Sequence, residues 1–342
     1  MRAGHITQCG TPDEAIQIVD VPRPDPKPHE VRLRVDACAL NHLDVFARTG
    51  HPDEDDCFPK RTGGDIMGIV DATGTCVENW QEGDRVVVYP GVTCGECEFC
   101  LNGEHTMCPD YRIIGEDLPG GLAEYVIVSA ANLDPVPEGM DAVTAAAWPA
   151  TFTTAWRMVV SAGDLRPAET ALVLGASGGV GNAALQLANR IGATVYATTS
   201  ADWKADRLET WADDVIDYTT TNFAERVREL TDGRGVDLVA DHVGQETWQR
   251  SIHSLAMDGR MVICGATSGA DPDIDIRSIY QHHRQIIGAP MGSRQDFRDV
   301  FRLISRGEVE LVIDRVLPLE DLAEGHHAIE NREVFGKVVI TP

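Results

Sequence analysis

The sequence predicts a two-domain α/β protein, in which a β-rich module accompanies a doubly wound parallel sheet. Three observations predict this fold. Short runs of alternating apolar and polar residues occupy the first part of the chain, β-rich and helical stretches alternate from about residue 142, and a glycine-rich turn joins a strand to a helix at residues 175–181. A chain of 342 residues with 43% hydrophobic side chains is long enough for two hydrophobic cores.

The β-rich module is predicted from alternation and from turn residues. Val31, Leu33 and Val35 alternate with polar residues, which is the period of a strand with one buried face. Similar runs, separated by glycine and proline, indicate further strands. These runs lie at residues 66–72, 85–89 and 124–128.

The parallel sheet is predicted from strands that alternate with helices. Buried strands are expected at residues 171–174, 194–198, 236–240 and 261–264. Helices are expected at residues 179–191, 203–211, 223–230 and 246–256. Such alternation implies crossover helices on a doubly wound sheet. A helix near residues 297–306 and a strand at residues 337–340 can belong to either module.

The chain is strongly acidic, since 54 Asp and Glu residues against 29 Lys and Arg residues give a formal net charge of -25. This charge repels nucleic acids and anionic membrane surfaces, and no run of basic residues offsets it, so neither partner is expected. Only four of the basic residues are lysines. Abundant acid with scarce lysine resembles the proteins of halophilic archaea, and we interpret it as adaptation to a salty solvent.

The chain shows no targeting or membrane segment. Its first residues lack an apolar stretch of the secretory type, and its longest uncharged stretch, residues 170–189, is rich in Gly, Ser, Asn and Gln. Nine cysteines, four of them within residues 94–108, favour a metal site in a reducing compartment over a disulfide framework. We therefore expect a cytoplasmic protein that acts on a small molecule.

The glycine-rich turn reads Gly175-Ala-Ser-Gly-Gly-Val-Gly181, and it follows a predicted strand and begins a predicted helix. In this variant of the dinucleotide fingerprint, Gly178 lets the backbone approach a pyrophosphate and Gly181 lets helix and strand pack closely. The N–H groups of the first helical turn, which includes Gly179 and Val180, attract the anion. The turn therefore predicts a nicotinamide dinucleotide site.

The end of the next strand bears on the choice of cofactor. An NAD site usually places an acidic residue there, on the ribose 2′-hydroxyl. No carboxylate ends this strand, whereas Ser200 and Lys204 can hold a 2′-phosphate. Asp202 lies between them and can cap the next helix or contact a ribose. We expect NADP(H), with NAD(H) as the alternative.

A second motif consists of four cysteines at the spacing Cys94-x2-Cys97-x2-Cys100-x7-Cys108. Four thiolates complete the tetrahedral sphere that Zn2+ prefers and leave no open position, which predicts one structural zinc per chain. An iron–sulfur cluster is the alternative, because a proline follows Cys108 as it does in ferredoxins. The ferredoxin run has three residues before its last cysteine, however, and this run has seven.

These two motifs, in this order, make the chain resemble the medium-chain dehydrogenase/reductase superfamily. Supporting segments are Ala39–Asp44, Gly83–Val87, Gly120–Tyr125, Thr154–Trp156, Asp241–Gly244 and Phe335–Val339. The resemblance implies a GroES-like catalytic domain at residues 1–148 and 291–342, with a structural-zinc lobe at 90–112, and a Rossmann NAD(P)-binding domain at 149–290. It also implies a homodimer or homotetramer that pairs through the edge of the Rossmann sheet, and the apolar segment near residues 286–291 is a candidate for this edge.

The resemblance implies contacts to the cofactor as well. Thr154 is expected beside the nicotinamide, and Tyr218 near the adenosine phosphate. Further contacts are expected at Val243, Gly265 and Lys337. No basic partner that would activate Cys264 is evident, so this residue is expected to pack under the cofactor.

The chain departs from the zinc-dependent members at all three catalytic ligands. Those members carry a cysteine where this chain has Asn41, the triplet Gly-His-Glu where it has Gly64-Asp65-Ile66, and a cysteine or acidic residue where it has Ala150. The carboxylate of Asp65 and a displaced thiol at Cys38 do not make the usual three-ligand open site. In this respect the chain is similar to the zinc-independent, zeta-crystallin-like quinone oxidoreductases, although it retains a lobe that they usually lack.

These departures indicate the chemistry. Hydride transfer without a Lewis acid favours acceptors that delocalise charge, so quinones and α,β-unsaturated carbonyls are the expected substrates. Asn41 is expected to donate an amide N–H to the developing oxyanion, and His42, Asp44 or His51 to relay the proton. Asn41 and Asp44 can instead brace their loop. The alternatives are an alcohol dehydrogenase or ketone reductase acting on secondary alcohols, and a non-catalytic NADPH-binding sensor.

Overall fold

The computed structural model describes residues 1–50 and 58–342, and these residues form two units. The first unit comprises Met1–Ala150 and Leu311–Pro342, and the second comprises Thr151–Glu310. Within the described ranges, no helix is long and apolar enough to cross a membrane.

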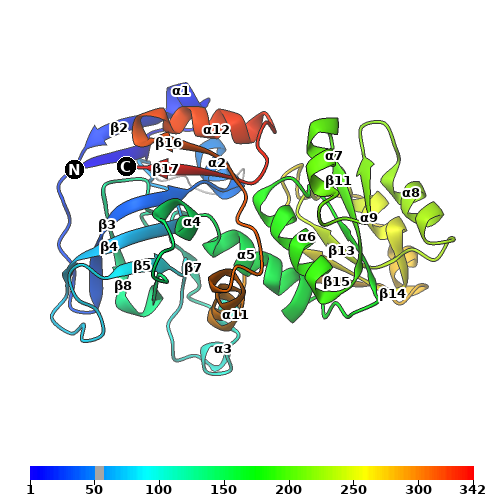
Figure 1. The fold of residues 1–342 in the computed structure, drawn as a ribbon, viewed down its shortest axis with the longest axis horizontal. Helices are drawn as coiled ribbons and strands as arrows, with labels where there is room; N and C mark the ends of the chain where they lie inside the picture. The colour runs from blue at the N-terminus through cyan, green and yellow to red at the C-terminus, as the bar shows by residue number, and fades with distance from the viewer. Residues whose placement is uncertain (51–57) are drawn as a thin grey trace. The chain divides into compact units, whose positions relative to one another are not determined.

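The first unit is built around a seven-stranded sheet with the order β16-β17-β3-β4-β5-β9, in which β8 also pairs with β3 (Figure 1). Its strands are β3 (Glu30–Ala39), β4 (Asp65–Thr73), β5 (Arg85–Val88), β8 (Tyr125–Ser129), β9 (Leu133–Pro135), β16 (Ile313–Pro318) and β17 (Lys337–Thr341). Neighbouring strands are antiparallel except β16 and β17, which are parallel. Residues 311–342 therefore extend a sheet that begins near the other end of the chain.

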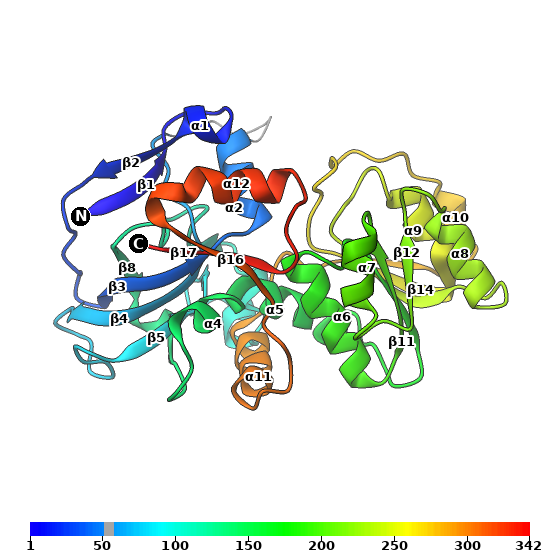
Figure 2. The ribbon, with the colours of Figure 1, turned by 45° about the horizontal axis from the view of Figure 1, so that its top comes forward.

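Smaller elements complete this unit. Two short sheets pair β1 (Arg2–Ile6) with β2 (Ile16–Asp20) and β6 (Gly91–Val92) with β7 (Arg112–Ile113). The helices are α1 (Pro12–Ala15), α2 (His42–Thr49), α3 (Glu98–Leu101), α4 (Ala142–Ala146) and α12 (Leu322–Glu330), with 3-10 turns at His105–Met107, Ala130–Asn132 and Leu319–Asp321. Figure 2 shows α12 beside α1 and α2, with which it is in contact.

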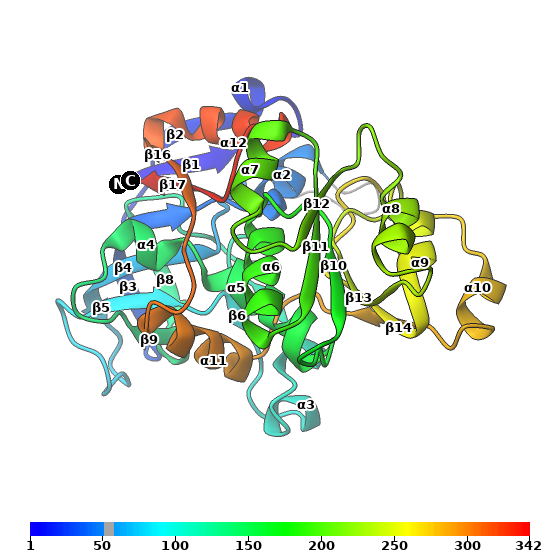
Figure 3. The same ribbon diagram turned by 45° about the vertical axis from the view of Figure 1, so that its right-hand side comes forward.

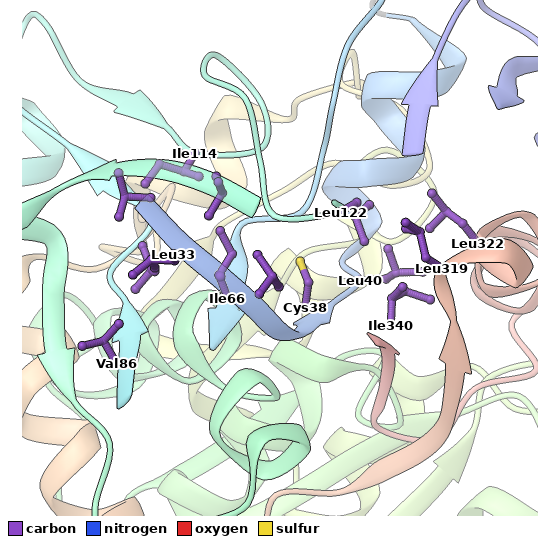
Figure 4. Packing of buried hydrophobic residues seen from close by; sticks show 14 of the residues in the cluster. Leu33, Cys38, Leu40, Ile66, Val86, Ile114, Leu122, Leu319, Leu322 and Ile340 are labelled. Atoms are coloured by element: carbon purple, nitrogen blue, oxygen red, sulfur yellow. The ribbon is translucent and has the colours of Figure 1, made fainter. Parts of the chain in front are cut away.

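The core of the first unit follows the apolar side of β3. Val31 and Leu33 have no exposed surface, as the alternation predicts for one face of a strand. The same cluster includes Cys38 and Ile66, which Figure 4 shows close together, and Ile340 of β17. Because burying one large aliphatic side chain contributes about 1.5–3 kcal/mol, this cluster holds the three neighbouring strands in register.

The second unit contains a six-stranded parallel sheet with the order β12-β11-β10-β13-β14-β15. Its strands are β10 (Thr170–Val173), β11 (Thr194–Thr199), β12 (Asp214–Asp217), β13 (Val236–Asp241), β14 (Leu255–Ile263) and β15 (Gln285–Gly288). Its helices are α6 (Gly179–Ile191), α7 (Asp202–Leu208), α8 (Phe223–Leu230), α9 (Trp248–Ser254), α10 (Ile276–Tyr280) and α11 (Arg294–Ser305), and α5 (Pro149–Trp156), followed by a π-helical turn at Arg157–Ser161, leads into it.

Helices cover both faces of the parallel sheet. Figure 3 shows α6 and α7 on one side of the strands and α8 and α9 on the other. The strand order reverses between β10 and β13, and ligands of such sheets bind at the carboxyl ends of the strands where this reversal occurs. The predicted fold class, a GroES-like β-rich domain and a doubly wound parallel sheet, is confirmed.

The second unit extends further along the chain than the expected boundary at residue 290. Helix α11 belongs to it, because Asp296 of α11 accepts a hydrogen bond from the Ser161 hydroxyl. The Gln186 side chain of α6 also exchanges hydrogen bonds of 2.8 and 2.7 Å with the backbone of Glu310. These contacts explain why the chain returns to the first unit at residue 311.

Candidate functional site

The glycine-rich turn lies at the carboxyl end of β10, where the strand order reverses. Gly181 is in the first turn of α6, and a Cβ there would stand 2.3 Å from the carbonyl oxygen of Gly175, so the close approach of helix and strand requires glycine. Gly178 precedes the helix, and the N–H of Asn182 donates to its carbonyl at 2.8 Å. The N–H groups of Gly179, Val180 and Gly181 precede this first helical bond, and helix geometry leaves such groups available to an anion.

The residues expected at the far end of the cofactor follow β11 and β12. Ser200 follows the last residue of β11, and Lys204 lies on α7 with 3% of its surface exposed. The Lys204 ammonium stands 5.2 Å from the centre of the Trp203 ring. Tyr218 follows β12, and its N–H donates to the carbonyl of Thr199 at 3.1 Å, which holds the two strand ends together.

A buried aspartate organises the turn that follows β13. Asp241 accepts hydrogen bonds from the N–H of Val243 at 2.8 Å, the N–H of Gly244 at 3.1 Å and the Ser251 hydroxyl at 2.7 Å. The turn that presents Val243 is therefore rigid. Sequence reasoning missed this role of Asp241, which is signalled by an acidic residue at the end of a buried strand, three residues before a glycine.

Two further groups lie beside the same strand ends. His242 packs against the glycine-rich turn, because a Cβ on Gly175 would stand 2.8 Å from its Nε2, and burial lowers the pKa of this imidazole. Burial raises the pKa of the Cys264 thiol to about 12, so the thiol stays protonated and unreactive. Gly265 follows Cys264, and Thr154 lies on α5 with 6% of its surface exposed.

In the first unit, Asn41 and Asp44 form a reciprocal cap at the start of α2. The backbone N–H of Asn41 donates to Asp44 Oδ2 at 2.7 Å, and the N–H of Gly63 donates to Asp44 Oδ1 at the same distance. Burial raises the pKa of Asp44 to about 6, although both N–H bonds and the Thr62 side chain favour the charged form. Asp44 thus braces the loop.

The strand register brings three polar side chains together beyond this cap. Val339 of β17 pairs with Ala39 of β3, which places Lys337 opposite Asn41, and Asp65 of β4 pairs with Ala39 from the other side. The Lys337 Nζ donates to Asn41 Oδ1 at 2.6 Å and to Asp65 Oδ2 at 2.9 Å. The Asn41 Nδ2 donates to the same Asp65 oxygen at 2.9 Å. We call these three residues the Asn41 cluster.

The Asn41 cluster does not fit a catalytic zinc. Asp65 is fully buried and both of its oxygens are engaged, since Oδ1 accepts the N–H of Ala150 at 2.6 Å. Ala150 brings no side-chain donor, and the Asn41 Oδ1 already faces an ammonium. Zinc prefers thiolate, imidazole and carboxylate donors, and a cation at the centre of the cluster opposes a second one. Cys38, the displaced thiol, is buried, and burial raises its pKa well above the usual value.

Of the two histidines that were expected to relay a proton, only His42 lies within the described residues. His42 lies on α2, and its ring meets Phe46 edge-on with ring centres 4.7 Å apart. His51 lies outside the described residues. The structure therefore brings Asn41 together with Asp44 and Lys337, whereas Lys337 was expected only as a cofactor contact.

The four cysteines of the lobe do fit a metal. One sulfur from each of Cys94, Cys97, Cys100 and Cys108 lies within 4.8 Å of the others. The Cys94 sulfur is 3.9 Å from that of Cys100 and 3.6 Å from that of Cys108. A tetrahedral zinc with bonds of about 2.3 Å separates its sulfurs by about 3.8 Å, so the lobe is preformed for such an ion.

Comparisons with known proteins agree with this arrangement. The family described as alcohol dehydrogenase GroES-like domain matches residues 27–138, and the family described as zinc-binding dehydrogenase matches residues 179–306. An acryloyl-coenzyme A reductase of Sulfurisphaera tokodaii is 31% identical, with 97% of this chain and 98% of the relative covered.

Two more comparisons extend the range of activities. A quinone oxidoreductase of Rattus norvegicus is 27% identical, with 99% of this chain and 97% of the relative covered. A crystal structure of an NAD-dependent alcohol dehydrogenase is 42% identical and superposes with a TM-score of 0.95, covering 100% of both chains. The chain is thus an NAD(P)-dependent oxidoreductase and belongs to the medium-chain dehydrogenase/reductase superfamily.

Proposed function

We propose that this protein uses NAD(P)H to reduce carbon–carbon double bonds conjugated to a carbonyl, or quinones, without a catalytic zinc. One observation carries the proposal: the side chains at the expected zinc-ligand positions, Asn41 and Asp65, bond to each other and to Lys337. The similarity to an acryloyl-coenzyme A reductase and to a quinone oxidoreductase supports it, since both names describe acceptors of this kind.

The chemistry of the acceptor follows from the missing Lewis acid. A simple ketone needs strong polarisation before it accepts a hydride, and a zinc ion would supply it. A conjugated carbonyl or a quinone spreads the incoming charge over several atoms, so hydrogen bonds suffice to stabilise it. The amide of Asn41 is the group best placed in the first unit to donate such a bond.

The cofactor is held by the second unit in this proposal. The pyrophosphate lies at the start of α6, against the N–H groups of Gly179, Val180 and Gly181, and a reduced nicotinamide, when bound, supplies the hydride. NADPH is the preferred form, because no carboxylate ends β11 and because Ser200 and Lys204 follow it. The name of the 42% identical neighbour favours NAD instead.

The discriminating experiment compares acceptors under one assay. Purified protein is supplied with NADPH or NADH and with an enone, an acryloyl thioester, a quinone and a simple ketone, while zinc is counted in the same sample. Turnover of the conjugated acceptors with one zinc per chain supports the proposal. Reduction of the ketone alone, or activity that needs a second zinc, contradicts it.

An alcohol dehydrogenase or ketone reductase is the second candidate. It is favoured by the similarity over the full chain to an NAD-dependent alcohol dehydrogenase. In this case Asn41 and Lys337 would bind the substrate oxygen by hydrogen bonds in place of a metal. Oxidation of a secondary alcohol at a rate comparable with enone reduction would establish it.

We also propose that the protein is a homodimer or homotetramer through the edge strand β15. Ile286 of β15 is 37% exposed, and Ile276 and Tyr280 of α10 are more than half exposed. Among the described residues β15 is the outermost strand of its sheet, and exposed apolar side chains on such a strand are typical of an interface. Light scattering of the wild type and of Ile286→Lys tests it, and a monomeric wild type would contradict it.

A further inference from the structure

The amide of Asn41 has only one orientation that its neighbours allow. Its Oδ1 accepts from the Lys337 ammonium at 2.6 Å, and its Nδ2 donates to Asp65 Oδ2 at 2.9 Å. A flipped amide would place its NH2 group against the ammonium and its oxygen against the carboxylate, and both contacts would be repulsive. The cation and the anion together therefore fix which end of the amide points where.

The fixed orientation leaves the second N–H of Asn41 without a partner among residues 1–50 and 58–342. An amide nitrogen has two N–H groups, and one of them is used by Asp65. Asp65 has no exposed surface and the Lys337 side chain is 5% exposed, whereas Asn41 is only partly buried. Asn41 is therefore the outermost member of the cluster, with the charged pair behind it.

The cation of the pair also strengthens the donor. A cation at the amide oxygen draws electron density away from the nitrogen, which makes the remaining N–H a better donor in a buried setting. Asp65 is itself held, because its other oxygen accepts the N–H of Ala150 at 2.6 Å. The arrangement is thus rigid before any substrate arrives, which is the condition for stabilising developing charge.

We propose that Asn41 is the oxyanion donor of this enzyme and that Lys337 and Asp65 are positioning residues that aim its second Nδ2–H at the substrate carbonyl oxygen. The proposal rests on the proposed reduction of conjugated carbonyls. Asp44 and the Cys38 thiol also face Lys337 within electrostatic reach, and both are buried.

The reaction adds one hydride and one proton across the double bond. Hydride from the reduced nicotinamide forms the new C–H bond at the β-carbon, and the π electrons of the double bond shift to give an enolate. The negative charge on the enolate oxygen is met by the Asn41 N–H. A proton from water then completes the α-carbon, and the cofactor leaves oxidised.

A cycle of variants tests whether Lys337 acts through Asn41. Asn41→Leu removes the donor. Lys337→Met combined with Asp65→Asn removes the positioning pair without leaving one buried charge unpaired. The triple variant combines both changes, and Lys27→Met serves as the control because the Lys27 side chain is 81% exposed. For each variant, kcat and KM for an enone are measured, together with the Kd of NADPH.

The expected result is that the losses of kcat do not add, because both changes remove the same hydrogen bond to the substrate. Removal of one oxyanion donor lowers kcat by about 10²–10³ fold, and removal of the pair lowers it by about tenfold or more. The triple variant then loses no more than Asn41→Leu alone, and the Kd of NADPH stays unchanged throughout. Losses that multiply in the triple variant, or an unchanged kcat with a raised Kd of NADPH, overturn the proposal and assign Lys337 to cofactor binding or to structure.

Two measurements distinguish a loss of catalysis from a loss of folding. Zinc content and the melting temperature identify a variant that fails to fold. In that case Lys337→Arg with Asp65 retained, which keeps the buried pair neutral, replaces the double change in the cycle, and its loss of kcat is likewise expected to be absent in the Asn41→Leu background. A wild type that reduces no conjugated acceptor overturns the proposed function and this inference together. An active wild type with unaffected Asn41→Leu overturns only the inference.

Discussion

The cysteine lobe and the Asn41 cluster, two regions of the first unit, differ in how positive charge is provided beside their polar side chains. Each gathers polar side chains around a point where positive charge is needed. The lobe presents four sulfurs within 4.8 Å of one another, a set of donors that a metal ion can satisfy. The Asn41 cluster contains its own cation in Lys337, and its oxygens are satisfied without a metal. The difference teaches that the donor set, rather than the fold, decides which point takes an ion.

The largest expected effect concerns the structural zinc that we propose for the lobe. Cys100→Ser removes one buried thiolate, so the affinity for zinc falls by more than about 100-fold and the purified protein contains almost no metal. Metal analysis and thermal unfolding measure the change. Cys76→Ser, at an exposed cysteine outside the lobe, serves as the control and keeps one zinc. Iron in the wild type would replace the zinc assignment.

The second prediction concerns variants that turn the Asn41 cluster into a metal site like the cysteine lobe. Asn41→Cys, Asp65→His and Ala150→Cys together restore metal donors, and with Lys337→Met the protein binds a second equivalent of Co2+. The same triple variant with Lys337 retained binds it more than about tenfold more weakly, because the ammonium repels the ion. Visible absorption of tetrahedral cobalt reports the difference. Equal affinity in both backgrounds would show that Lys337 does not occupy the centre.

The third prediction concerns pH and the cap beside the cluster. Folding raises the pKa of Asp44 to about 6, so between about pH 4 and pH 6 the folded protein holds this proton more tightly than the unfolded chain does. The wild type therefore loses about 3 kcal/mol of unfolding free energy relative to Asp44→Asn as the pH rises through this range. Denaturant titrations of both proteins at several pH values measure it. Parallel pH profiles would contradict the raised pKa.

The smallest effect is expected from salt. We propose that the net charge of -25 reflects adaptation to high salt, so salt raises the melting temperature by screening repulsion among surface carboxylates. The Lys337–Asp65 pair is buried, and salt should leave its contribution unchanged. The difference in melting temperature between the wild type and the Lys337→Met, Asp65→Asn variant is thus constant from low to molar salt. A melting temperature that falls with salt would contradict the adaptation.

Much of the fold could be predicted from the sequence because its signals are local. The glycine-rich turn predicts α6 at residues 179–191, and the structure has a helix over Gly179–Ile191. The apolar segment near residues 286–291 was a candidate sheet edge, and β15 (Gln285–Gly288) is the outermost strand next to β14. The bounds of β15 were not predicted, because its four residues carry no alternation and only the neighbouring strand specifies them. The boundary at residue 311 likewise depends on hydrogen bonds between distant segments.

Of the candidate site, the sequence predicts the part whose residues are close together in the chain. The four cysteines are close in sequence, so their spacing alone indicates a common ligand. Lys337 is 296 residues from Asn41 and 272 from Asp65, and only the register of β17 on β3 brings them together. Substituted ligand positions in the sequence predict that a catalytic metal is missing, but they do not predict which side chains fill its place.

The insertion of the second unit between the two parts of the first has a consequence for biosynthesis. Asn41 and Asp65 leave the ribosome early, the whole parallel sheet follows, and Lys337 comes later. Because synthesis adds about 5–20 residues per second, Lys337 is added on the order of tens of seconds after Asp65. The second unit can fold during that interval. The Asn41 cluster can assemble only after the second unit has been synthesised, because Lys337 follows it in the chain.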